Sequence, residues 1–266
     1  MPSLRPLSAM GADAYPFDEF ETRGFCVVPA SQPEALDGLR SHIWRVAMRL
    51  AGAPSTDADS DLNGLHRHVH GPDDATRFRL ALTKAITEGY DVGAAVFDAF
   101  DGYLSRLVGT DVLSQRVPNV VFQPPGDPHP TELHRDAPAN SPYEVVVWLP
   151  LVDCFGTKSM YLLDRTATTH ALETYRRSPE DQLGFQSLLE ERSVQMSVPY
   201  GSALLFWSAL FHGSVVNTEP ESRISLNTRF KNLFAPLGMK DPFRYFSILH
   251  TTPLTRLGMR FQQDEA

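Results

Sequence analysis

The chain has 266 residues, of which 42% are hydrophobic and 21% charged, and its formal net charge is −8. This composition is that of a globular protein, and the length fits one large domain, because single cores commonly stop growing at roughly 250 to 300 residues. We therefore expect one domain over residues 1–266. The acidic balance, without a block of lysine or arginine, excludes the electrostatic footprint of a nucleic-acid-binding protein.

The sequence also favours a soluble, cytoplasmic protein that does not act at a membrane. Cys26 and Cys154 are too few for a disulfide framework and lack a C-x-x-C spacing, as is typical of a reducing compartment. The N-terminal segment has no continuous apolar core of the kind found in signal peptides. The longest apolar run, "ALLFWSALF", is well below the roughly 18 residues that a spanning helix needs.

The first half of the chain predicts helices behind one short strand. Residues 20–30 predict a strand after a turn at Gly24, and "SQPE" at residues 31–34 has the pattern of a capping box that begins a helix. A second helix is expected over residues 91–108, because its apolar residues recur at helical spacing. The intervening polar segment, residues 52–74, predicts a mobile loop.

From residue 116 onward the pattern changes to strands. Residues 117–123 and 143–152 are rich in β-branched and aromatic residues, and further strands are expected at residues 203–207 and 223–231. A helix over residues 178–194 interrupts this series. Helices followed by strands indicate a sheet sandwich or barrel flanked by helices.

"ELHRDAP" contains the first residues that suggest chemistry. His134 and Asp136 are two positions apart, so both side chains leave the same face of an extended strand and can take adjacent positions on a metal ion. His212, 76 positions after Asp136, is the candidate third ligand. Two histidines and one carboxylate leave coordination positions open, which suits Fe(II) that binds an organic co-substrate and O₂.

"RISLNTRFK" predicts a strand with one polar and one apolar face. The polar face carries Arg223, Ser225, Asn227 and Arg229. A guanidinium with a hydroxyl beside it is suited to paired, charge-assisted hydrogen bonds with a carboxylate. We expect Arg223 and Ser225 to hold the far carboxylate of a dicarboxylic co-substrate whose keto-acid end chelates the iron.

The combined pattern of His134, Asp136, His212, Arg223 and Ser225 resembles that of the Fe(II)/2-oxoglutarate-dependent dioxygenases, in particular the phytanoyl-CoA dioxygenase-like superfamily. Further matches are "FETRGF" near the N-terminus and "VVFQPPGD" before the first ligand. The segments "VVWLPLVD" and "RISLNTRFK" are most similar in sequence to those of oxygenases of carbohydrate and aminoglycoside-type antibiotic pathways.

The resemblance covers residues 18–232 and implies a fold, a cofactor and a co-substrate. The implied fold is a double-stranded β-helix (a cupin-like jelly roll), mainly β with flanking helices; Fe(II), 2-oxoglutarate and O₂ are the implied reactants. In this superfamily the tryptophan matching Trp148 lies beside 2-oxoglutarate. Residues 52–90 and 155–195 match nothing in it, and we expect them to shape the substrate pocket.

The reaction implied by this resemblance is the hydroxylation or oxidative cyclisation of a small polar molecule, such as a sugar-containing or aminocyclitol natural product. The carboxylate of Asp136 argues against a halogenase, because halogenating relatives replace it with a small residue to make room for halide. Two alternatives keep the barrel. One is a metal-dependent sugar isomerase or epimerase of the cupin type, and the other is a non-catalytic carbohydrate-binding jelly roll.

Five other polar residues are weaker candidates. Asn119 and Gln123 share one face of a strand, and either a hydrogen bond to the co-substrate or a structural role is open to them. In "HRHVH", His66 and His68 are most simply exposed loop side chains; a substrate contact comes second and a second metal site third. Arg229 is a candidate substrate contact, although pairing with an acidic neighbour is the simpler expectation.

Overall fold

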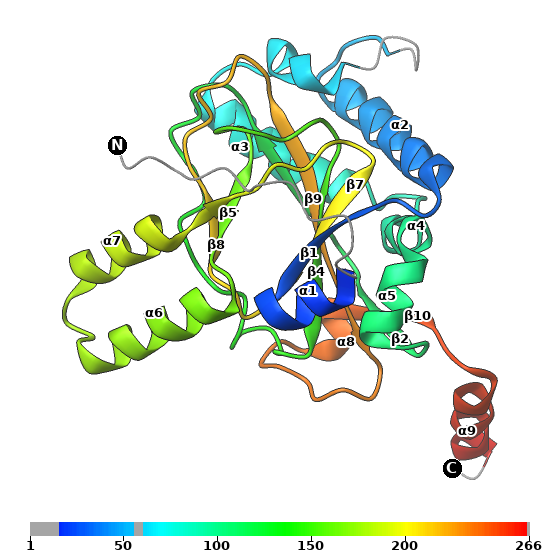
Figure 1. Cartoon of the computed structure of the whole chain (residues 1–266). Coiled ribbons are helices and arrows are strands. Elements are labelled where there is room, and N and C mark those ends of the chain that lie inside the picture. Colours follow the sequence, from blue (N-terminus) through cyan, green and yellow to red (C-terminus); the bar gives the residue numbers. More distant parts are fainter. Residues whose placement is uncertain (1–15, 56–60, 265–266) are drawn as a thin grey trace.

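The computed structural model describes residues 16–55 and 61–264. Two antiparallel β-sheets form its centre, and helices pack around them (Figure 1). The strands of the larger sheet are, in spatial order, β1 (Phe25–Pro29), β7 (Ser202–Trp207), β4 (Glu144–Pro150), β9 (Arg223–Asn232), β2 (Val112–Gln115) and β10 (Phe246–His250), with β3 (Asn119–Gln123) paired to β9. Those of the smaller sheet are β6 (Val194–Gln195), β5 (Met160–Leu162) and β8 (His212–Ser214).

The helices lie on the outside of this pair of sheets. They are α1 (Pro16–Arg23), α2 (Pro33–Leu50), the 3₁₀-helix η2 (Leu62–His68), α3 (Pro72–Ala85), α4 (Val92–Ala99), α5 (Asp101–Val108), α6 (Arg165–Arg177), α7 (Gln182–Arg192), α8 (Pro242–Tyr245) and α9 (Pro253–Asp264). In Figure 1, α2, α4 and α5 lie on one side of the larger sheet, whereas α6 and α7 project from the opposite side, next to β5 and β8. None of the helices in the described ranges is both long and apolar enough to cross a bilayer.

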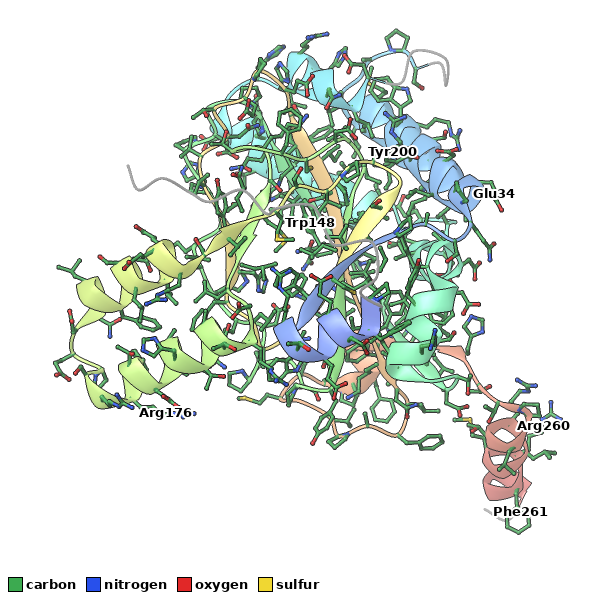
Figure 2. All side chains as sticks on the ribbon, viewed as in Figure 1. Glu34, Trp148, Arg176, Tyr200, Arg260 and Phe261 are labelled. Carbon is green, nitrogen blue, oxygen red and sulfur yellow. The ribbon has the colours of Figure 1, made fainter. Side chains whose placement is uncertain are left out.

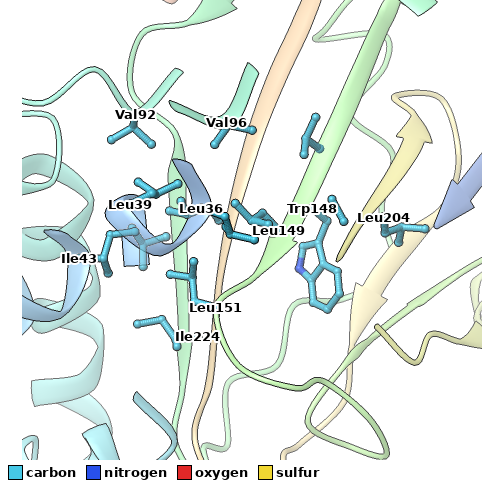
Figure 3. Close-up of a cluster of buried hydrophobic side chains, with 14 of the residues drawn as sticks. Leu36, Leu39, Ile43, Val92, Val96, Trp148, Leu149, Leu151, Leu204 and Ile224 are labelled. Atoms are coloured by element: carbon cyan, nitrogen blue, oxygen red, sulfur yellow. The ribbon is translucent and has the colours of Figure 1, made fainter. Parts of the chain in front are cut away.

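Strand β4 separates the helix-facing core from the interior between the sheets. Leu149 lies opposite Leu226 of β9 and belongs to the core that α2 and α4 complete with Leu36 and Val96 (Figure 3). Trp148 leaves the other face, fully buried, opposite Asn227 of β9. Because successive side chains on a strand alternate, the polar face of β9 is directed into the same interior as Trp148.

The larger sheet also fixes the position of β3, which pairs with β9 in antiparallel register. Asn119 lies opposite Asn227, and Gln123 lies opposite Arg223. Directly opposed residues in an antiparallel pair share a face. Asn119 and Gln123 are therefore directed toward the interior that Arg223 faces, as the alternation in the sequence predicts.

The expected capping box at residues 31–34 is wrong. Helix α2 begins at Pro33, and its N-cap, Gln32, makes no side-chain capping bond. The backbone N–H groups of Ser31 and Gln32 both donate to the carbonyl of Ala99, at 2.7 and 3.4 Å. The end of α4 therefore satisfies the donors that a local cap would have taken.

The expected loop over residues 52–74 is only partly a loop. Residues 56–60 lie outside the described residues, but Leu62–His68 form η2, whose Asp61 side chain accepts a hydrogen bond from the Gly64 N–H at 3.0 Å. Leu62 and Leu65 are fully buried. Residues three apart fall on one side of a 3₁₀-helix, so two leucines suffice to dock this otherwise polar segment.

The helix expected over residues 91–108 is divided into α4 and α5 by the buried Phe100, whose φ is −128°. The helix expected over residues 178–194 begins only at Gln182, where Asp181 caps it. Helix α6 and the C-terminal elements β10 and α9 were not expected. Strand β10 depends on its pairing with β2, a tertiary contact that local residue patterns report weakly, whereas α9 is largely exposed and projects from the body of the molecule (Figure 1).

Candidate metal centre

The backbone brings His134 and His212 together from distant parts of the chain. His134 precedes β4, His212 begins β8, and the two residues form an isolated antiparallel bridge. Each backbone N–H donates to the carbonyl of the other, at 3.0 and 2.9 Å, and the ring centroids are 4.4 Å apart. Asp136 follows on the same segment, and one potential ligand atom from each of the three residues lies within 4.8 Å of the others. This arrangement could hold one divalent cation.

Both imidazoles are oriented by backbone carbonyls. Nδ1 of His134 lies 2.8 Å from the carbonyl oxygen of Glu132, and Nδ1 of His212 lies 3.0 Å from that of Leu210. A carbonyl can only accept, so each Nδ1 carries the proton and each Nε2 keeps its lone pair for a metal. Burial lowers the pKa of His212 to about 4 despite the nearby Asp136 carboxylate, so this imidazole is neutral at physiological pH. A neutral imidazole is the form that a metal ion binds.

Arg229 holds the third candidate ligand. Its Nε and Nη2 donate to Oδ2 of Asp136 at 3.0 and 2.5 Å, and its Nη1 donates to Oε1 of Gln115 at 2.9 Å. Burial alone would raise the pKa of Asp136, but the Arg229 guanidinium, together with the neighbouring His212 and His134, lowers it. The carboxylate is therefore charged, and Oδ1 is left for a cation. Of the two roles considered for Arg229, the structure favours pairing with an acidic neighbour over a substrate contact.

Arg223 lies in a buried group of polar atoms with unused hydrogen-bonding capacity. Its Nη1 donates to the carbonyl of Ser159 at 2.6 Å, but its Nε has no partner in the described structure. The Oγ atoms of Ser159 and Ser225, Oε1 of Gln123 and Oδ1 of Asn227 are likewise buried without a partner. Burial lowers the pKa of Arg223 to about 10, so the guanidinium remains charged at neutral pH.

The donors of this group fit the distal carboxylate of 2-oxoglutarate, whereas the amide oxygens of Gln123 and Asn227 only accept hydrogen bonds and cannot bind it. Buried polar atoms almost always have hydrogen-bond partners, so several orphans around one buried arginine indicate a missing ligand. The guanidinium of Arg223 and the hydroxyl of Ser225 are donors, and a carboxylate supplies two acceptor oxygens.

The candidate ligands and Arg223 share one cavity of about 380 Å³. Its lining also includes Asn119, Trp148 and Asn227. Figure 2 shows Trp148 deep inside the body of the molecule, away from the labelled surface residues. The three candidate ligands thus share a cavity with Arg223, Trp148 and Asn119, although these residues come from four separate strands and one loop. Ser225 and Gln123 do not line this cavity.

His66 and His68 do not line this cavity. His68 is exposed at the end of η2. Nδ1 of His66 lies 2.9 Å from Oγ of Ser222, and the backbone N–H of His66 donates to the same oxygen at 3.2 Å. His66 is therefore a half-buried side chain that supports Ser222, the residue that immediately precedes Arg223.

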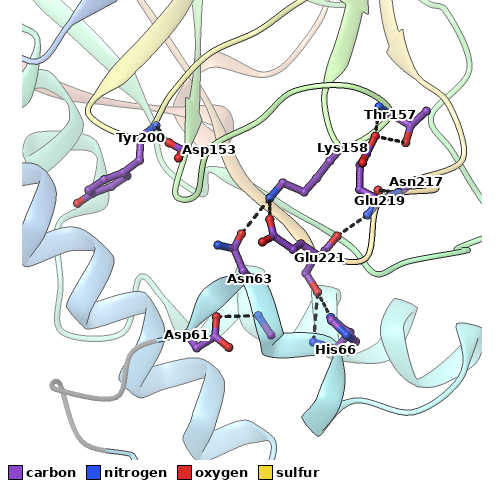
Figure 4. A network of polar contacts seen from close by, with 12 residues as sticks. Asp61, Asn63, His66, Asp153, Thr157, Lys158, Tyr200, Asn217, Glu219 and Glu221 are labelled. Atoms are coloured by element: carbon purple, nitrogen blue, oxygen red, sulfur yellow. Dashed lines mark hydrogen bonds and ion pairs between the residues drawn. The ribbon is translucent and has the colours of Figure 1, made fainter.

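A polar network around Lys158 was not foreseen from the sequence (Figure 4). The Lys158 side chain is fully buried; its Nζ donates to Oδ1 of Asn63 at 3.0 Å and forms an ion pair with Glu221. The carbonyl of Asn63 accepts the N–H of Ser222 at 2.8 Å. The network thus fixes η2 to the approach of Arg223. Lys158 also directly precedes Ser159, whose carbonyl accepts a hydrogen bond from the guanidinium of Arg223. Ser159 and Ser222, which both hold Arg223 in place, therefore adjoin this network.

Four further polar residues of the cavity lining also escaped the sequence analysis. Arg79 and Thr83 lie on α3, and Thr131 and Lys240 lie in loops. No motif marks them, because their approach to the cavity depends on the docking of α3 against β3 and on the loop between β9 and α8.

A family model described as phytanoyl-CoA dioxygenase (PhyH) matches residues 20–225. The chain belongs to this family. It is therefore a 2-oxoglutarate-dependent dioxygenase by family, and the resemblance seen in its sequence is confirmed. A comparison with curated proteins gave no match.

Solved structures with the same fold include three proteins of low sequence identity. HygX from Streptomyces hygroscopicus, with nickel and 2-oxoglutarate bound, has a TM-score of 0.51 and 14% identity, covering 92% of this chain and 98% of that one. EvdO2 from Micromonospora carbonacea var. aurantiaca, complexed with 2-oxoglutarate, has a TM-score of 0.52 and 15% identity, covering 89% and 97%. SnoK, a non-heme alpha ketoglutarate dependent carbocyclase from nogalamycin biosynthesis, has a TM-score of 0.53 and 12% identity, covering 88% and 90%. The double-stranded β-helix with flanking helices is confirmed.

Proposed function

We propose that residues 1–266 form a single oxygenase domain in which His134, Asp136 and His212 hold Fe(II). The observation that carries this proposal is the convergence of three ligand atoms within 4.8 Å, in the same cavity as a buried arginine. Iron, when bound with 2-oxoglutarate, supplies the O₂ chemistry that no side chain can perform. The chain supplies position: the carbonyls behind both imidazoles and the guanidinium behind Asp136 fix the ligand atoms.

Arg223 and Ser225 are proposed to hold the distal carboxylate of 2-oxoglutarate. Arg223 supplies charge and a planar pair of donors, and Ser225 adds a hydroxyl donor from the same face of β9. Trp148 and Asn119 line the cavity and are proposed to form its walls around the co-substrate. The Nε2 of Gln123 donates to the carbonyl of Val215 at 2.7 Å, and its Oε1 is buried without a partner, so we propose a supporting position for Gln123 opposite Arg223.

The proposed substrate is a small polar natural product that undergoes hydroxylation or oxidative cyclisation. The structures with the same fold support this class, since SnoK is described as a carbocyclase of nogalamycin biosynthesis. A sugar-containing or aminocyclitol product is the finer prediction from the sequence. A sugar isomerase or a carbohydrate-binding jelly roll would leave the buried Arg223 and its orphaned neighbours without a purpose.

The test combines co-substrate binding with turnover. The purified full chain is incubated with Fe(II), ascorbate and 2-oxoglutarate, and its 2-oxoglutarate affinity and succinate production are measured with and without candidate substrates. We expect binding of 2-oxoglutarate and succinate formation that increases with substrate. A chain that binds no 2-oxoglutarate in the presence of Fe(II) would disprove the proposal.

Arg223→Ala tests the co-substrate assignment. Loss of a buried charge-assisted pair costs about 3 kcal/mol, so the Kd for 2-oxoglutarate should rise roughly 100-fold. Affinity for Ni(II) alone should not change, because Arg223 contacts none of the three candidate ligands. Arg223→Lys keeps the charge and should recover part of the affinity. An unchanged Kd for 2-oxoglutarate in Arg223→Ala would refute the assignment.

A further inference from the structure

We propose that the substrate carries an anionic oxyacid group, such as a carboxylate or phosphate, and that Arg79 and Lys240 bind it. This inference rests on the proposed function, because it concerns the part of the cavity that metal and 2-oxoglutarate leave to the substrate. Both cations line the cavity that contains the candidate metal ligands. Arg79 is half-buried on α3, and Lys240 is exposed in the loop before α8.

The cavity has more positive than negative side chains. Arg79, Arg223, Arg229 and Lys240 line it, and Asp136 is the single acidic residue among the lining residues of the described segments. Arg229 is neutralised by Asp136, with which it forms an ion pair at 2.5 Å. Arg223 is assigned to the distal carboxylate of 2-oxoglutarate. Two cations therefore remain without an anion of their own.

Neither of these cations has an acidic partner in the structure as described. Arg77, which lies two residues before Arg79 on the same helix, forms an ion pair with Asp74. Arg79 makes no such contact within the described residues. Lys240 makes a cation–π contact, with its Nζ 4.2 Å from the ring centroid of Tyr245. Their charges are thus free to act on a ligand.

Bound metal and co-substrate do not alter this balance. Fe(II) carries two positive charges and the 2-oxoglutarate dianion two negative ones. Because one of these carboxylates is already paired with Arg223, the other neutralises only half of the charge on the iron, and no negative charge is left over for Arg79 and Lys240. The surplus at Arg79 and Lys240 stands out because the whole chain has a net charge of −8. A cleft lined by one sign of charge attracts ligands of the opposite sign.

The surplus positive charge of Arg79 and Lys240 favours some of the substrate classes that the sequence suggested over others. An aminocyclitol carries ammonium groups, which these cations would repel. A sugar acid or a sugar phosphate can accept charge-assisted hydrogen bonds from both cations. The neutral lining residues Thr83 and Thr131 are suited to hydroxyl groups of the same molecule.

Binding of four sugars that differ in charge provides the test. The full chain is loaded with Ni(II) and 2-oxoglutarate, which occupy the metal site and Arg223 without turnover, and is titrated at low ionic strength with glucose, glucosamine, glucuronate and glucose 6-phosphate. At least one of the two acids should bind about tenfold more tightly than glucose, which corresponds to 1.4 kcal/mol, and glucosamine should bind no better than glucose. Added salt should reduce the preference.

Single substitutions locate the effect. Arg79→Ala and Lys240→Ala should each remove most of the preference for the acids, whereas Arg79→Lys should retain it. Arg77→Ala is the matched control, since Arg77 lies on the same helix but is exposed and does not line the cavity. Lack of any preference for the acids, no measurable binding of them, or a preference that survives both alanine substitutions would overturn the inference. If 2-oxoglutarate itself fails to bind during loading, the proposed function fails instead.

Discussion

At the scale of single residues, the two carboxylate oxygens of Asp136 have different roles. Arg229 directs both Nε and Nη2 to Oδ2, and Gln115 holds the remaining side of the guanidinium. One oxygen is thereby fixed by the protein, while Oδ1 receives no hydrogen bond from Arg229. A carboxylate held in this way is suited to binding a metal through one atom, which leaves more coordination positions for 2-oxoglutarate and O₂.

Arg229→Ala should therefore weaken metal binding without touching a ligand. Loss of a partner that orients a metal ligand typically costs about 10- to 100-fold in affinity, so the Kd for Ni(II) measured by calorimetry should rise by that amount. Arg229→Lys, which retains one charged donor, should lie between this variant and the wild type.

Arg116→Ala serves as the control for this prediction, because Arg116 is exposed and donates to the carbonyl of Phe243, away from the cavity. Unfolding should be followed alongside, since Arg229→Ala leaves a buried carboxylate without its cation. A folded Arg229→Ala variant with wild-type affinity for Ni(II) would show that Asp136 is positioned by other contacts.

Among the secondary-structure elements, β8 and the segment before His134 approach each other unusually closely. A Cβ atom built on Gly213 would lie 2.8 Å from the carbonyl oxygen of Thr131 and 3.0 Å from the carbonyl carbon of Glu132. These neighbours are backbone atoms and cannot rotate away. The absence of a side chain at Gly213 is thus what allows His212 and His134 to form their backbone bridge.

Gly213→Ala should force these two segments apart. We expect a loss of about 2 kcal/mol in the free energy of unfolding, the usual cost of overpacking, together with weaker Ni(II) binding. Gly38→Ala is the matched control: Gly38 lies in α2, and its nearest neighbour would be the hydroxyl of Tyr90 at 3.9 Å. In a helix this change should stabilise the chain by roughly 0.5 to 1 kcal/mol. Urea denaturation of both variants measures the contrast, and equal stabilities would contradict it.

Strand patterns made much of the site predictable, because a period of two decides which side chains share a face. Arg223 and Ser225 could be placed on one face for this reason before any fold was known. His134 and Asp136 also meet, but they lie in the loop before β4 and not on the extended strand that the sequence predicted. The partners of these residues could not be placed in this way. Arg229 and Asp136 are 93 positions apart, and Lys158 meets Asn63 across 95 positions. Such pairs depend on strand order and on the docking of η2, which no local pattern encodes.

For the molecule as a whole, the apolar core includes both cysteines. Cys26 lies on β1 and Cys154 in the loop after β4, and each is almost fully buried. Burial raises the pKa of each thiol to about 12. Only the thiolate is nucleophilic, so the native chain should be inert toward thiol reagents.

Thiol titration should therefore report global unfolding. In native buffer at pH 8, a disulfide reagent such as DTNB should react no faster than the chain unfolds, and both thiols should react promptly in concentrated urea. Rapid labelling of one thiol in the native chain would reveal an opening near β1 or after β4 that the packed structure does not contain.

The backbone bridge between His134 and His212 has a consequence for the choice of ion. Because peptide groups, and not the ion, set the separation of the two imidazoles, these ligands have little freedom to follow a change in ionic radius. Adjustment to a larger or smaller divalent cation must come from Oδ1 of Asp136, the oxygen to which Arg229 does not donate, and from the bound keto acid. The preference of the site for iron over other first-row transition metals should accordingly be determined by Asp136 more than by the two histidines.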